Sequence, residues 1–161
     1  MNKLKMSETD KAIISQCGKN ARERYEASGT SLKKIVVKWL MDNNYDVENL
    51  KNSLILLKTE GKEILCVIST CTEDRNNKNY TVGIESADNY SKENGNNNSW
   101  VVLFAMISGE DVTGLRVMDQ EKVRAIAKEY TRSSGLGSYF ACNFNDVQKY
   151  SIEFGDWVNK I

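Results

Sequence analysis

The side chains available for chemistry in this chain are carboxylates, lysines and cysteines, because its 161 residues include no histidine. Ser-His-Asp and Cys-His catalysis are therefore excluded within the chain. The four cysteines form no C-x-x-C pair, the spacing that zinc sites usually use. We therefore expect no cysteine-based metal site and interpret the cysteines as free thiols in a reducing cytoplasm.

Carboxylates are the groups that could hold a hard cation such as Mg²⁺. Glu63 lies near the start of an apolar stretch and Glu73 and Asp74 follow its end, so these three are the candidate acids for metal-dependent hydrolysis. The alternative interpretation is that they are solvated charges at the ends of a strand. We favour the alternative and expect no cofactor, with Mg²⁺ required only if these acids form a site.

Three lysines, Lys33, Lys34 and Lys38, could form a basic patch for nucleic acid. The whole chain, however, has 22 basic and 22 acidic residues and zero formal net charge. Proteins that bind DNA through its phosphates are usually basic. We therefore interpret the lysines first as a solvated helix face, and expect a protein or nucleoprotein partner rather than naked DNA.

The clearest element that could position these groups is an amphipathic helix. Its apolar residues recur at helical spacing, and Ser31 can cap its start: Leu32, Ile35, Val36, Trp39 and Leu40. An earlier helix is predicted from Ser7, ending at Gly29. No run of about 18 apolar residues exists, so we expect no membrane span.

A hairpin is predicted next, with strands around 54–57 and 64–68 and a turn at Glu60-Gly61. Residues 73–99 are polar and are predicted as a long flexible loop with a brief strand at 80–84. Strands follow at 100–107 and 112–118. A helix begins after Asp119 and extends to Tyr130, and a strand at 138–144 precedes a final helix opened by Asn145 or Asp146. The order α-α-β-β-(β)-β-β-α-β-α predicts one α+β domain, an α/β sandwich with a mixed sheet of about five strands.

Several short segments of the sequence, taken in order, resemble those of a known family. A helix ends in the segment from Trp39 to Val47, Ser53 opens an apolar strand with a turn, and Val67-Ile68-Ser69 lies on the next strand. A very apolar strand and a helix follow between 101 and 123. Over roughly residues 31–130, this order resembles the core of the PD-(D/E)XK, or restriction-endonuclease-like, nucleases. The resemblance implies metal-binding acids at positions 53 and 67 and a lysine at position 69.

Those three positions hold Ser53, Val67 and Ser69, which cannot replace two carboxylates and an ammonium. The resemblance therefore implies a nuclease-like domain with a degenerate site that binds a partner without hydrolysis. From the size and composition of the chain, we expect an inhibitor or accessory protein of a phage or mobile element. Two alternatives stay open: a Mg²⁺-dependent endonuclease that uses the displaced acids, and a small-ligand or nucleotide-binding domain that uses residues 73–99 as a lid. A homodimer that buries an apolar edge is a further option.

Overall fold

Helix α2 (Ala21–Asp42) covers one face of the central sheet in the computed structural model, which describes residues 21–74, 78–94, 99–131 and 138–161. The predicted apolar stripe is confirmed, with Val36 and Leu40 fully buried. The predicted break at Gly29 and the cap at Ser31 are wrong, because both residues lie inside α2. The first part of the helix predicted from Ser7 falls outside the described residues.

The central sheet has six strands in the order β1-β2-β3-β5-β6-β9. The predicted hairpin is confirmed as β2 (Leu54–Thr59) and β3 (Lys62–Thr72), and Gly61 takes a φ of +76° in its turn. Strands β3 and β5 (Trp100–Ser108) are parallel, whereas every other neighbouring pair is antiparallel. The remaining members are β1 (Asp46–Asn49), β6 (Asp111–Asp119) and β9 (Ile152–Glu153).

Strand β6 carries a bulge close to the turn that joins it to β5. Ile107 pairs with Val112 and Met106 pairs with Gly114, so Thr113 is an extra residue in β6. A bulge of this kind bends a strand and increases its local twist. On its other side β6 pairs with β9 only at Arg116 and Val117.

A second, three-stranded sheet was not predicted from the sequence. Its order is β4 (Asn79–Gly83), β8 (Ser138–Asn143) and β7 (Lys128–Thr131), all antiparallel. The brief strand near 80–84 and the strand from Ser138 are thus confirmed. The helix predicted to reach Tyr130 is wrong, because α4 (Gln120–Ile126) ends earlier and Tyr130 belongs to β7.

The predicted loop at 73–99 is also wrong, because it contains helix α3 (Glu85–Asn94). This helix has few apolar residues, so its sequence lacks a clear helical stripe. Tertiary contacts hold it instead: Asp88 accepts a hydrogen bond from the Trp100 indole at 3.0 Å and pairs with Arg124 at 3.3 Å. Arg124 also lies over the Trp100 ring, 5.5 Å from its centroid.

The two C-terminal helices are short and have clear starts. Asn143 caps α5 (Phe144–Tyr150) by accepting from the amide of Asp146, so this helix starts before the predicted Asn145 or Asp146. Asp119 caps α4 in the same way, as predicted, through the amide of Lys122. Helix α6 (Phe154–Val158) follows β9.

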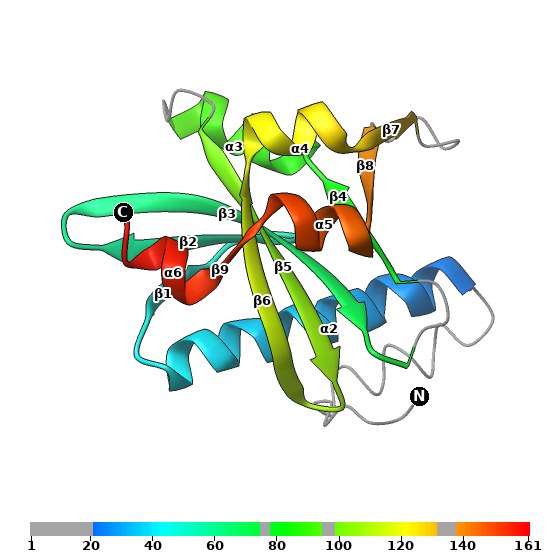
Figure 1. The fold of residues 1–161 in the computed structure, drawn as a ribbon, viewed down its shortest axis with the longest axis horizontal. Helices are drawn as coiled ribbons and strands as arrows, with labels where there is room; N and C mark the ends of the chain where they lie inside the picture. The colour runs from blue at the N-terminus through cyan, green and yellow to red at the C-terminus, as the bar shows by residue number, and fades with distance from the viewer. Residues whose placement is uncertain (1–20, 75–77, 95–98, 132–137) are drawn as a thin grey trace.

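The fold is therefore an α+β sandwich with a separate core on each face of the central sheet. We call the core between the sheet and α2 the α2 core; it includes Val36, Cys66 and Phe154. The opposite core, the small-sheet core, lies beneath α3, α4, α5 and the second sheet and includes Cys71 and Phe140. Figure 1 shows α2 on one side of the sheet and α3 and α4 on the other. Cys66 and Cys71 thus face opposite cores, as their spacing predicts.

Candidate functional site

The three positions that the nuclease resemblance singles out lie next to one another at the edge of the small-sheet core. Val67 is fully buried and Ser69 is 2% exposed, and Val67 pairs with Leu54 of β2. On the other side Val67 and Ser69 pair with Val102 and Phe104 of β5. Because side chains alternate along a strand, residues 67 and 69 face the same layer.

Strand β4 covers that layer. The hydroxyl of Ser69 donates a hydrogen bond to the carbonyl of Thr81 at 2.9 Å. One residue earlier, the ring of Tyr80 meets the ring of Phe104 edge to face, with centroids 5.0 Å apart. The Ser69 hydroxyl is therefore used to hold the second sheet, and its neighbour Val67 contributes only apolar surface.

Ser53 has a backbone role. Its carbonyl accepts a hydrogen bond from the amide of Ile68 at 2.7 Å, just before β2 begins. Its side chain is half-buried. Together, positions 53, 67 and 69 offer two hydroxyls and an isopropyl group, and a hard cation such as Mg²⁺ prefers carboxylate oxygens.

The fallback acids do not come together. Glu63 lies at the start of β3 and Glu73 one residue beyond its end, so about 33 Å of extended strand separates them. Glu73 accepts a hydrogen bond from the hydroxyl of Thr113 at 2.8 Å, and its amide donates to the carbonyl of Ile107. Asp74 is exposed beside it. Within the described parts of the chain, no three acidic or cysteine side chains are arranged to hold a metal ion.

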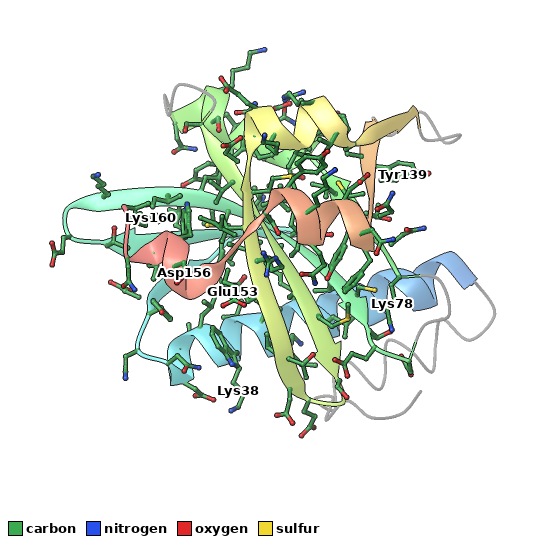
Figure 2. All side chains as sticks on the ribbon, viewed as in Figure 1. Lys38, Lys78, Tyr139, Glu153, Asp156 and Lys160 are labelled. Carbon is green, nitrogen blue, oxygen red and sulfur yellow. The ribbon has the colours of Figure 1, made fainter. Side chains whose placement is uncertain are left out.

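The three candidate lysines do not form one patch. Lys33 is only 8% exposed, and its ammonium donates to the carbonyl of Leu50 at 2.8 Å. Burial lowers the pKa of Lys33 from 10.5 to about 8. Lys34 and Lys38 are exposed, and Lys38 pairs with Asp42 at 2.6 Å; Figure 2 shows Lys38 on the outer side of α2.

The interpretation of Lys33 as part of a solvated helix face is therefore wrong. The sequence did contain a signal for its burial, because Lys33, Val37 and Leu40 recur at i, i+4 and i+7. These residues widen the apolar stripe on one side. The pattern was missed because a lysine interrupts it.

A partly exposed aromatic cluster is the other notable surface. Phe154 is buried, and three rings surround it: Tyr45 at 5.0 Å, Trp157 at 5.8 Å and Trp39 at 6.4 Å between centroids. These outer three side chains keep part of their surface in solvent. We call these four residues the Phe154 cluster. Figure 2 shows Asp156 and Lys160 near the same end of the molecule.

The Phe154 cluster joins three elements far apart in sequence, because Trp39 is on α2, Tyr45 precedes β1 and Trp157 is on α6. The sequence predicts Trp157 and Phe154 as anchors of the C-terminus and the three tryptophans as core residues. Trp100 is buried as predicted, but Trp39 and Trp157 are only partly buried. Partly exposed tryptophan and tyrosine side chains are enriched at protein interfaces.

The helices of the described residues include none that is long and apolar enough to cross a membrane. No protein-family model matches the chain, and no curated protein matches it either.

Proposed function

We propose that this protein is a nuclease-like α+β domain that binds a protein or nucleoprotein partner without hydrolysing nucleic acid. One observation carries the proposal. The side chains at the expected acid and lysine positions serve the fold, since Ser69 holds β4 and Val67 is part of the small-sheet core. A site rebuilt there would need three substitutions and the displacement of β4.

The Mg²⁺-dependent endonuclease is the second candidate, and the separation of its acids is against it. Two carboxylates must approach one cation to within about 2.1 Å each. Glu73 and Asp74 are adjacent in sequence, but Glu63 lies at the far end of β3. Glu73 is also already hydrogen-bonded to Thr113.

The proposed binding surface is the Phe154 cluster. Aromatic side chains supply large contact areas with few rotatable bonds, which limits the entropy lost on binding. Trp39 and Trp157 both project from helices whose backbones are fixed by the α2 core. The partner is therefore expected to present an apolar surface. The proposed compartment is the cytoplasm, since Cys66, Cys71 and Cys142 are free thiols.

A cleavage assay tests the absence of hydrolysis. Purified protein is incubated with supercoiled plasmid DNA and either Mg²⁺ or Mn²⁺, beside a Glu73→Ala/Asp74→Ala variant purified in the same way. We expect no nicking by either protein. Metal-dependent nicking by the wild type that disappears in the variant would establish the endonuclease instead.

A binding assay with matched variants tests the surface. The immobilised chain is used to retain proteins, and the wild type is compared with Trp157→Ala and with Tyr150→Ala, an exposed aromatic residue outside the cluster. We expect the wild type and Tyr150→Ala to retain the same partner protein. Trp157→Ala should fail to retain it. Equal retention by the wild type and both variants contradicts the assignment of the surface. Retention that nuclease treatment abolishes identifies a nucleoprotein. A doubled mass in sedimentation would identify a second copy as the partner.

A further inference from the structure

The turn between β1 and β2 is held by a buried lysine on one side and by helix α3 on the other. Lys33 of α2 is 8% exposed, and its ammonium donates to the carbonyl of Leu50 at 2.8 Å. An ammonium has three donors, and this is its single hydrogen bond among the described residues. The charge is thus largely removed from solvent, with far less compensation than full hydration would give it.

The same turn reaches across the sheet edge to the opposite face. The side chain of Leu50 packs against the small-sheet core, although its carbonyl meets Lys33 of α2. Asn52 takes a φ of +55° and donates from its amide to the hydroxyl of Ser86, in the first turn of α3, at 2.9 Å. The turn therefore contacts helices on both faces of the central sheet.

We propose that the turn at residues 50–53 is a pH-sensitive latch: deprotonation of Lys33 stabilises the turn in its closed position against α2, and protonation shifts the equilibrium toward an open turn and a released α3. This inference is independent of the proposed partner binding. It concerns an equilibrium within the folded protein, in which the turn and α3 open together while the central sheet stays intact.

The physical reason is the difference in solvation of the ammonium between the two states. In the closed state burial lowers the pKa of Lys33 to about 8, whereas in an open turn the ammonium would meet water and recover a pKa near 10.5. The open state therefore binds the proton more tightly. Protonation favours opening, and the closed state gains stability as the pH rises from about 8 to 10.5.

Charged groups on the elements around Lys33 do not offset its burial. In β1 Asp46 and Glu48 are exposed, and Glu48 pairs with Lys58 of β2 at 3.0 Å; in the turn Lys51 is exposed. The burial of Lys33 is the single cause of its lowered pKa. On the remaining elements that pack against α2 or the turn, the described charges are exposed or paired elsewhere: Lys62 and Glu63 of β3, Glu85 of α3, and Asp111, Arg116 and Asp119 of β6.

Hydrogen exchange measured by mass spectrometry between pH 7.5 and 9.5 tests the latch in the full chain. Rates are corrected for the intrinsic pH dependence, and peptides from the turn, from α3 and from β5 are compared. We expect the opening equilibrium of the turn and of α3 to fall by roughly tenfold over this range, while the protection of β5 changes less. In Lys33→Met the protection of the turn should no longer depend on pH.

Lys34→Met is the matched control, because Lys34 is the exposed neighbour on the same helix. It should keep the pH dependence of the wild type. An NMR titration of the Lys33 side chain gives a second readout that does not need a variant. A turn whose protection is independent of pH, an equal change in β5, or a titration near 10.5 would each overturn the latch.

Discussion

The hydroxyl of Ser69 on β3 donates to the carbonyl of Thr81 on β4, so this hydrogen bond links the central sheet to the second sheet. Ser69 is 2% exposed, so its hydroxyl has little access to water as an alternative partner. Ser69→Ala should leave the Thr81 carbonyl without that donor and cost about 1 kcal/mol of unfolding free energy. Urea unfolding measures the change. Thr81→Ala alters only an exposed side chain and should be close to neutral.

Val67→Asp is a more disruptive change on the same face. It places a carboxylate at the position where the nuclease resemblance implies a metal-binding acid. The carboxylate would be buried in the small-sheet core without a positive partner among the described residues. We expect a loss of about 3 kcal/mol or more in unfolding free energy at pH 7, and a smaller loss at pH 4, where the acid is protonated. Stabilisation of this variant by Mg²⁺ in a thermal-shift assay would mean instead that a metal site forms there.

Lys33→Met should stabilise the protein at neutral pH. The folded-state pKa of Lys33, about 8, lies below its usual 10.5, so the unfolded chain binds more protons between these values. The lysine therefore costs stability below pH 8, and the cost disappears as the pH rises to 10.5. Because the ammonium keeps some contact with solvent, we expect a gain of about 1 kcal/mol at pH 7. Unfolding curves at pH 7 and pH 10 check it; equal gains at both pH values would contradict the reason given.

Asp88→Ala should loosen α3. This change removes the acceptor of the Trp100 indole and the ion-pair partner of Arg124, two polar contacts that link α3 to β5 and to α4. We expect a loss of about 1–2 kcal/mol in unfolding free energy and a change in the fluorescence of Trp100. Asp88→Asn keeps an acceptor for the indole and removes only the charge, so it should cost less. Equal losses in the two variants would assign the effect to the ion pair alone.

The buried thiols should resist modification. Burial raises the pKa of Cys66 to about 12 and that of Cys142 to about 11, so neither forms appreciable thiolate at pH 8. In a Cys17→Ser variant, which removes the cysteine outside the described residues, a thiol reagent should modify none of the remaining three rapidly in the native state. All three should react in denaturant. Fast reaction of one thiol in the native protein would show that its strand opens.

The sequence predicts those helices and strands whose own residues show a hydrophobic periodicity. The stripe of α2 and the apolar strands β2, β3 and β5 are recognisable because hydrophobic burial selects their periodicity. Helix α3 is not, since it depends on Asp88, Trp100 and Arg124, which are distant in sequence. The second sheet is missed for a related reason, because β4 pairs with β8, which lies far along the chain.

The candidate site was predictable only in part. That Val67 and Ser69 share a face follows from alternation along one strand. That β4 covers this face depends on the path of the chain between residues 79 and 143, which no local pattern encodes. The burial of Lys33 could have been predicted from its helical spacing with Val37 and Leu40. Its acceptor could not, because the carbonyl of Leu50 is a backbone group that every residue has.

The extra residue at Thr113 also bears on how this protein avoids association with copies of itself. Among the described residues, β9 pairs with β6 at two positions, and the rest of that side of β6 is an outer edge of the kind to which further strands can add. The bulge distorts that edge, and the Asp111 carboxylate lies beside it. A continuous sheet built through β6 would first have to straighten the bulge and release Thr113 from Glu73. The free-energy cost of that rearrangement opposes the addition of further strands at this edge.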